Sequence, residues 1–329
     1  MRIPVILFSI LFALYAATVP SCHAATSCHP LFLLDPSGAV GATQPRIDAV
    51  NPCTDDSFHV YSPTSAVFGT VVDFAVSSDM QTCAILHLPT RTEWELVVIR
   101  LSSGQTVLRT GGSTSTWAWS SEVSYHPSNN QIAVAIRSTA LSGVESSVWF
   151  VDLAAGGGGA IEADVPLDCA WSPSWSPTGE RIAVAHAGGS SVCVLDSQTL
   201  SVEHTFYPYG ICASRFGCCT QVEWSPDGFS LAFSDSSYVS EGIALGIQGT
   251  NGEGSRSYRY DDWTLPGPLC GDSFRVRDFT WSPDSDWIAV LATCFASGDQ
   301  YVLALSTSSD SVEVLYGPRE ARWITRLDW

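Results

Sequence analysis

Trp224-Ser225-Pro226-Asp227-Gly228 is followed two residues later by Leu231-Ala232-Phe233. The first stretch joins an aromatic anchor to a tight turn, because proline fixes φ, aspartate bonds to nearby backbone and glycine takes the left-handed conformation. The second stretch is short and apolar, as expected for a buried strand, and its small alanine lets a neighbouring sheet approach. The phrase therefore predicts two antiparallel strands joined by a tight turn.

The same phrase occurs five times along the chain. Clear copies begin at Trp175 and Trp281, and weaker copies begin at Val76 and Tyr125, so that successive anchors are 49, 50, 49 and 57 residues apart. A regular long period indicates a repeat architecture. Each copy continues into two further short strands, and four strands per unit of this length are typical of a β-propeller blade.

The two ends of the chain predict one more blade. Arg326-Leu327-Asp328-Trp329 has the pattern of a first strand, Leu31–Asp35 that of a third strand and 46–50 that of a fourth. A blade built from both termini would close the ring and hide its sheet edges. No apolar partner follows Trp329, so this blade is expected either to have three strands or to belong to a truncated product. The expected fold is thus an all-β, six-bladed β-propeller whose last blade is completed by both termini.

The first 24 residues have the pattern of a secretory signal peptide. Arg2 is the basic start, 3–19 form the apolar core, and Cys22-His23-Ala24 is a small-residue cleavage pattern. The apolar core is shorter than a membrane span requires. We therefore predict a signal peptide at 1–24, a single propeller domain at 25–329 and a secreted or extracytoplasmic location, with an uncleaved membrane anchor as the alternative.

The repeated phrase resembles the TolB-type, WD40-like propeller repeat, which also occurs in propeller domains of prolyl-oligopeptidase-family enzymes. The resemblance covers about residues 70–329 directly and 28–52 by inference. It implies the fold but no particular activity. The first two copies depart from the pattern because they lack tryptophan, and the second has Ser128-Asn129 in place of Asp-Gly. Those enzymes also need a catalytic domain, and this chain has no G-x-S-x-G nucleophile motif.

Alternate residues of each first strand are expected to face the central channel of a propeller. The residues one and three positions before the anchors include the five carboxylates Asp73, Glu122, Glu223, Asp278 and Asp328. The same face carries Ser124, Ser172, Ser174, Gln221, Thr280 and Arg326. One interpretation is a cation site, with calcium as the candidate because hard cations prefer oxygen ligands. The favoured interpretation is a solvated acidic channel with no cofactor, in which Arg326 accompanies the carboxylates.

The loops between blades form a second candidate binding face. Arg215, Asp262, Trp263 and Arg275 come shortly before or at the start of first strands, and charged and aromatic loop residues suit ligand recognition. A purely structural role is the alternative.

Ten cysteines follow residue 24, and an even number in an exported chain favours disulfides over a metal site. The candidate pairs are Cys28 with Cys53, Cys212 with Cys218 or Cys219, and Cys270 with Cys294. Sequence alone does not fix the connectivity.

These features favour an exported, non-catalytic scaffold that binds a protein, peptide or glycan. The formal net charge of −18 disfavours nucleic acid, whose phosphates would be repelled. The alternative is a propeller enzyme, a metal-assisted hydrolase, lyase or lactonase, that uses the acidic channel. A defunct or partial copy of a larger protein is the third interpretation.

Overall fold

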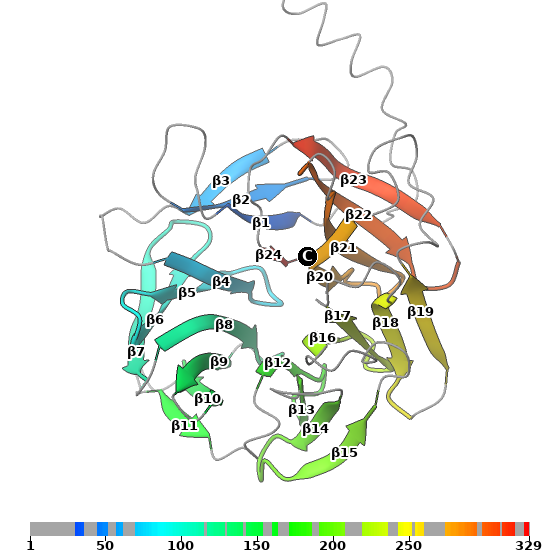
Figure 1. Cartoon of the computed structure of the whole chain (residues 1–329). Helices are drawn as coiled ribbons and strands as arrows, with labels where there is room; N and C mark the ends of the chain where they lie inside the picture. The colour runs from blue at the N-terminus through cyan, green and yellow to red at the C-terminus, as the bar shows by residue number, and fades with distance from the viewer. Residues whose placement is uncertain are drawn as a thin grey trace, which may run out of the picture.

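The computed structural model describes residues 30–35, 45–51, 57–61, 70–114, 117–128, 130–140, 143–153, 160–163, 171–185, 191–207, 219–235, 243–251, 254–259, 274–294, 298–309, 311–319 and 326–328. These residues form six antiparallel sheets of four strands each, and none of them is helical. The sheets are arranged as blades around a central axis (Figure 1). The predicted six-bladed β-propeller is confirmed. In the described residues, no helix is long and apolar enough to span a membrane.

The first three blades follow the chain in order, and each has its first strand at one edge of the sheet. Blade 1 consists of β4 (Thr70–Val76), β5 (Thr82–Leu88), β6 (Glu93–Arg100) and β7 (Thr106–Ser113). Blade 2 consists of β8 (Trp117–Tyr125), β9 (Gln131–Ala140), β10 (Gly143–Asp152) and β11 (Ile161–Ala163). Blade 3 consists of β12 (Trp171–Trp175), β13 (Arg181–Ala185), β14 (Val192–Asp196) and β15 (Val202–Phe206).

The remaining blades complete the ring, and the sixth combines both ends of the chain. Blade 4 consists of β16 (Cys219–Trp224), β17 (Ser230–Asp235), β18 (Ile243–Gly249) and β19 (Ser255–Arg259). Blade 5 consists of β20 (Phe274–Trp281), β21 (Trp287–Cys294), β22 (Gln300–Ser306) and β23 (Val312–Arg319). Blade 6 consists of β24 (Arg326–Asp328), β1 (Leu31–Asp35), β2 (Arg46–Val50) and β3 (Ser57–Tyr61).

The closing blade has four strands, which corrects the expectation of a three-stranded blade. β1 pairs directly with β24, with Leu33 opposite Leu327, so β1 is the second strand of the blade and not the third. β2 is accordingly the third strand, and the unpredicted β3 supplies the fourth by pairing with β2. The assignment shifted by one place because Leu31–Leu34 is a fully apolar, buried run without the Ile-Ala-Val signature of other second strands.

A buried serine stabilises the turn between the first two strands in blades 1, 3, 4 and 5: Ser77, Ser176, Ser225 and Ser282. The Ser225 hydroxyl donates to Asp227 at 2.6 Å and accepts the Ser230 backbone N–H at 2.9 Å. Ser282 makes the equivalent bonds to Asp284 and Trp287. Ser225 and Ser282 are 1% and 0% exposed, so they hold the start of the second strand against the end of the first.

In blades 1, 3, 4 and 5 the third residue after the serine has a positive φ, and Gly179 and Gly228 occupy this position in blades 3 and 4. A Cβ on Gly179 would lie 2.2 Å from His126 Nε2, whereas a Cβ on Gly228 would meet Pro177 only at 3.6 Å. We expect Gly228→Ala to lower the free energy of unfolding by about 1 kcal/mol through backbone strain alone. Gly179→Ala should lower it by about 2 kcal/mol, since it adds a steric clash.

Chemical denaturation of the two variants and of the double variant His126→Ala/Gly179→Ala measures the difference. The double variant removes the clashing ring, so the additional loss caused by Gly179→Ala should disappear in the His126→Ala background. Equal losses in the two single variants would contradict the clash between neighbouring turns.

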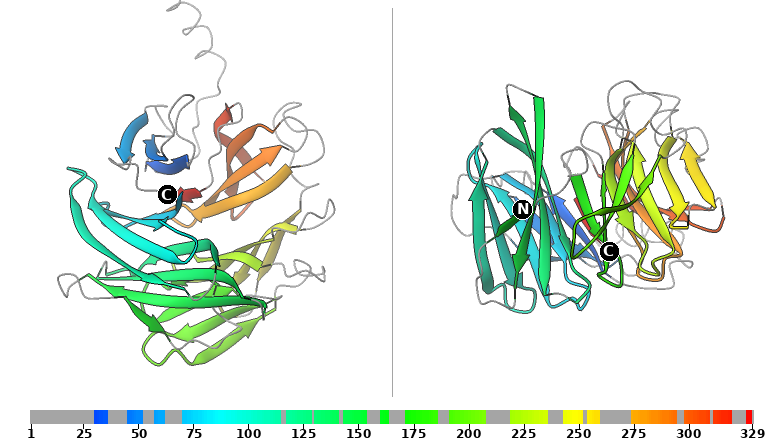
Figure 2. Two further views of the ribbon diagram at one scale, coloured as in Figure 1. Left: turned by 60° about the vertical axis from the view of Figure 1, so that its left-hand side comes forward. Right: turned by 90° about the horizontal axis from the view of Figure 1, so that it is seen from below.

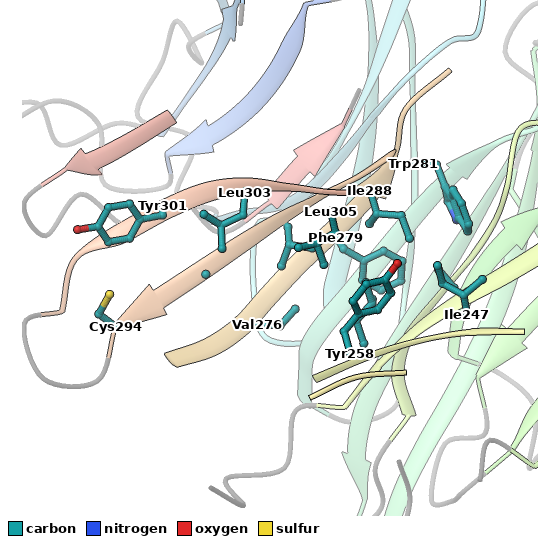
Figure 3. Close-up of a cluster of buried hydrophobic side chains, with 14 residues drawn as sticks. Ile247, Tyr258, Val276, Phe279, Trp281, Ile288, Cys294, Tyr301, Leu303 and Leu305 are labelled. Atoms are coloured by element: carbon teal, nitrogen blue, oxygen red, sulfur yellow. The ribbon is translucent and has the colours of Figure 1, made fainter. Parts of the chain in front are cut away.

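Six clusters of buried apolar side chains hold the ring together, and each spans two neighbouring blades. Between blades 4 and 5, for example, Ile247 and Tyr258 face Phe279, Trp281 and Leu303 (Figure 3). Tyr258 also donates its hydroxyl to the Ser306 carbonyl across this interface at 2.7 Å. Blade 6 shares one cluster with blade 5 and another with blade 1, so the ring is closed by packing as well as by strand pairing.

The first strands lie innermost in the ring. Figure 2 shows the blades from two further directions, with their strands running across the thickness of the ring and β24 close to the axis. This arrangement brings residues of six sequence segments together around one central space.

Candidate functional site

A cavity of about 450 Å³ lies on the propeller axis and is lined by all six first strands. It also reaches the turns that follow four of these strands, where Ser78, Pro127, Pro177 and Pro226 contribute to its wall. We call this space the central cavity. We call the face of the propeller that carries these turns the turn side, and we expect a ligand to enter the cavity from this face.

Two rows of side chains form the polar wall of the central cavity. The lower row comes from three positions before each anchor: Asp73, Glu122, Ser172, Gln221, Asp278 and Arg326. The upper row comes from one position before each anchor: Ala75, Ser124, Ser174, Glu223, Thr280 and Asp328. The structure therefore places every channel-facing residue named from the sequence at one cavity. Their use in binding stays a prediction.

Several wall residues join one blade to the next. Each first strand is an edge strand, and its outward N–H groups lack a partner within its own sheet. The Asp73 carboxylate accepts the Val123 N–H of the next blade at 2.8 Å. Asp278 and Asp328 likewise accept the N–H groups of Leu327 and Val76.

Serine hydroxyls accept the backbone N–H groups of the next first strand between blades 3 and 4. The Ser172 hydroxyl accepts the Val222 N–H at 3.0 Å, and the Ser174 hydroxyl accepts the Trp224 N–H at 2.9 Å. In the next interface the direction is reversed, since the Gln221 amide donates to the Phe279 carbonyl at 2.9 Å. Much of the polar wall is thus a network of hydrogen bonds, which we call the lattice, to backbone groups at the edges of the first strands. Strand alternation alone does not predict this role.

Arg326 is the electrostatic centre of this lattice. Its guanidinium lies 3.3 Å from Asp73, 3.3 Å from Glu122 and 3.4 Å from Asp278, and its side chain is only 16% exposed. These three carboxylates come from blades 1, 2 and 5, while Arg326 itself belongs to blade 6. One guanidinium group therefore forms ion pairs with three blades that are far apart in the sequence.

The carboxylates of the wall are not fully compensated by this one cation. Burial raises the pKa of Asp73 well above its usual range despite the opposing effect of Arg326. Burial likewise raises the pKa of Asp278 to about 6, although Arg326 and the Leu327 N–H lower it. Burial by itself lowers the pKa of Arg326, but the three carboxylates outweigh it and raise the pKa overall.

Glu223 differs from the lower-row carboxylates because it forms no ion pair among the described residues. Burial raises its pKa well above the usual range, and the nearby Asp278 and Asp328 carboxylates raise it further. The Gln221 amide, which donates to Glu223 Oε1 at 3.1 Å, and the Trp281 backbone N–H of the next blade only partly oppose these effects. Ionisation of Glu223 in the free protein therefore costs free energy.

Replacing Glu223 with glutamine should consequently raise the free energy of unfolding at pH 7.5, by about 1 kcal/mol, because it removes an uncompensated buried charge. The new amide oxygen can still accept the Gln221 hydrogen bond. Urea denaturation of wild type and Glu223→Gln at pH 7.5 measures the change. A loss of stability would show that Glu223 belongs to the lattice that holds the blades together.

Solved structures with this architecture support the fold and span several kinds of protein. TolB from Acinetobacter baumannii is 14% identical with a TM-score of 0.63, and the match covers 98% of this chain and 71% of that chain. The chain shares the propeller fold of this protein. A chain of a nidogen/laminin complex is 8% identical (TM-score 0.57; coverage 91% and 98%), and the Pseudomonas aeruginosa periplasmic gluconolactonase PpgL is 14% identical (TM-score 0.55; coverage 90% and 84%). No family model and no curated protein matches the sequence.

Metal binding and nucleophilic catalysis each need a particular grouping of side chains. The described residues contain no group of three or more His, Cys, Asp or Glu side chains placed to hold a metal ion. His126 Nδ1 lies 2.7 Å from the Ser128 hydroxyl, but this pair occupies the turn position where Ser225 and Asp227 pair in blade 4. We therefore interpret it as a turn closure.

The loop-face candidates lie largely outside the described residues. This applies to Arg215, Asp262 and Trp263, to the side chain of Arg275, and to Cys28, Cys53, Cys212, Cys218 and Cys270. The side chain of Cys219 is outside them as well. Cys294 is described, is 1% exposed and lies at the end of β21. The predicted signal peptide at 1–24 is also outside the described residues.

Proposed function

We propose that this protein is an exported, non-catalytic scaffold whose central cavity binds a protein or peptide segment that enters from the turn side. The observation that carries the proposal is the cavity of about 450 Å³, lined by polar side chains from all six blades. Its size and mixture of polar and apolar wall suit the insertion of a few side chains. The upper-row residues Ser124 and Thr280 take no part in the backbone contacts described above and line the cavity together with Glu223.

The solved structures that share the fold include both binding proteins and an enzyme. Among the described residues, the wall lacks a metal-binding group, which makes a metal-assisted reaction in the cavity the less supported alternative. Binding without catalysis needs only the shape and charge that the cavity has.

Export and disulfides belong to the same proposal. The signal-peptide pattern of residues 1–24 supports export, where disulfides form and persist. Among the described cysteines, Cys83 has a free thiol. Cys294 is buried at the end of β21, and its predicted bond to Cys270 is part of this proposal.

A peptide-display experiment tests the binding function. A random peptide library is selected against the wild-type protein, and the affinities of the recovered peptides are measured for wild type and for Ser124→Phe. The new ring would fill part of the cavity, so we expect binding to fall at least tenfold. Val107→Phe adds the same ring to the outer strand β7, at a residue that is 53% exposed, and should leave binding unchanged. Failure to recover peptides, or equal binding by the Ser124→Phe variant, would refute the proposal.

A further inference from the structure

The upper row of the central cavity contains a hydroxyl with no hydrogen-bond partner among the described residues. Thr280 is 6% exposed and lines the cavity, yet its hydroxyl forms no hydrogen bond with any other described residue. Its hydroxyl oxygen is not among the fully buried polar atoms that lack a partner, so this oxygen is open to the cavity and available to a donor there. Thr280 thus presents an unpartnered polar group to the cavity in addition to the surrounding charge.

Glu223 lies next to Thr280 in the same row, because β16 and β20 are the first strands of neighbouring blades. Glu223 forms no ion pair among the described residues, whereas Arg326 is occupied by Asp73, Glu122 and Asp278. Asp328 continues the row on the other side of Thr280. The three residues form an arc of oxygen acceptors, which we call the acceptor arc.

The charge of the wall determines which ligand the acceptor arc fits. Five carboxylates and a single arginine line the cavity, so its wall is negative when these groups are ionised. Burial first, and neighbouring carboxylates second, raise the pKa values of Asp73, Glu223 and Asp278, so a cation placed beside them would favour their ionised forms. An inserted cation would supply positive charge, and N–H donors would satisfy the Thr280 hydroxyl at the same time.

We propose that the acceptor arc binds the ammonium or guanidinium group of a lysine or arginine side chain, which a peptide inserts into the central cavity from the turn side. This inference rests on the proposed binding function and names the chemistry of the inserted group. An organic cation fits better than a metal ion, since the described residues offer no group of three ligands around one point. Its several N–H donors instead reach acceptors on neighbouring blades.

Three tripeptides that differ at one side chain test the inference: acetyl-Ala-Lys-Ala-amide, acetyl-Ala-Arg-Ala-amide and acetyl-Ala-norleucine-Ala-amide. Affinities are measured by NMR titration at pH 7.5. We expect the lysine or arginine peptide to bind at least tenfold more tightly than the norleucine peptide. Binding of the basic peptide should also weaken from pH 7.5 to pH 5, because protonation removes negative charge from the wall.

Variants locate the effect in the acceptor arc. Glu223→Gln and Thr280→Val keep the side-chain volumes and should each weaken the basic peptide at least fivefold. Glu203→Gln is the matched control, because this carboxylate pairs with Arg181 on the surface, and it should leave the affinity unchanged. The unfolding transitions of the variants are recorded to show that each is folded.

Each outcome separates this inference from the proposed function. Equal binding of the norleucine and basic peptides would overturn the inference while leaving peptide binding intact. No binding of any of the three tripeptides, with library peptides still bound, would also overturn it. Calcium chloride is titrated in a further arm, and displacement of the basic peptide by Ca²⁺ at micromolar concentration would assign the arc to a metal ion instead.

Discussion

Replacing Arg326 with methionine should lower the free energy of unfolding by about 3 to 5 kcal/mol at pH 7.5. The substitution keeps an unbranched side chain but leaves Asp73, Glu122 and Asp278 without their shared cation. Removing one partner of a buried ionic group is strongly destabilising, because the remaining charges stay buried and uncompensated. The loss should be smaller at pH 5, since the raised pKa values of Asp73 and Asp278 favour the neutral acids there.

Arg181→Met is the matched control for this prediction. Arg181 forms an ion pair with Glu203 at 2.7 Å, but its side chain is 50% exposed, so its loss should cost less than about 1 kcal/mol. Urea denaturation of both variants at pH 7.5 and pH 5 gives the comparison. Similar losses for the two arginines, or a loss for Arg326→Met that does not change with pH, would contradict the role of Arg326 as the centre of the lattice.

The second large effect concerns the pH dependence of stability through Asp278. Its pKa is raised from 3.8 to about 6 in the folded protein, so the folded state holds this proton more tightly than the unfolded state does. Ionisation of Asp278 therefore lowers the free energy of unfolding as the pH rises from about 4 to about 6, by on the order of 3 kcal/mol. Asp278→Asn removes this ionisation, and its stability relative to wild type should increase over the same interval.

Asp196→Asn is the control with the opposite sign. The backbone N–H and hydroxyl of Thr199, together with the Gln198 N–H, lower the pKa of Asp196, so its ionised form favours the folded state. The wild type should therefore be the more stable of this pair at neutral pH, and the difference should shrink as the pH falls. Denaturation curves at half-unit intervals from pH 2.5 to pH 7.5 cover both trends, because the effect of Asp196 is lost only below its ordinary pKa of 3.8. A flat difference for Asp278→Asn would contradict the buried-acid account.

The sequence predicts the architecture because each local signal agrees with the global fold. The Ser-Pro-Asp-Gly turn, the following apolar strand and the regular spacing of the anchors all describe the same blade. Strand alternation also places Asp73, Glu122, Glu223, Asp278 and Asp328 on one face, and the structure brings these residues to one cavity. Periodicity thus carries information about position around the axis as well as about secondary structure.

Other features depend on ring closure, which no local pattern contains. The contact of Arg326 with Glu122 joins residues 204 positions apart, and only the closed ring brings them together. The fourth strand of blade 6, Ser57–Tyr61, is short and lacks the anchor phrase, so it was missed. The acceptance of neighbouring N–H groups by Asp73 and Ser172 likewise depends on how adjacent blades dock.

The central claim is that the cavity wall combines a lattice that joins the blades with an acceptor arc that binds a cation, and that Asp328 takes part in both. The carboxyl-carbon resonances of Glu223, Asp73 and Asp278, followed by ¹³C NMR during titration with acetyl-Ala-Lys-Ala-amide, test this claim most directly. We predict that the Glu223 resonance shifts on saturation and that its pKa falls, because a bound cation favours the carboxylate. Asp73 and Asp278 should change far less. A Glu223 resonance that does not move while the peptide binds would contradict the account.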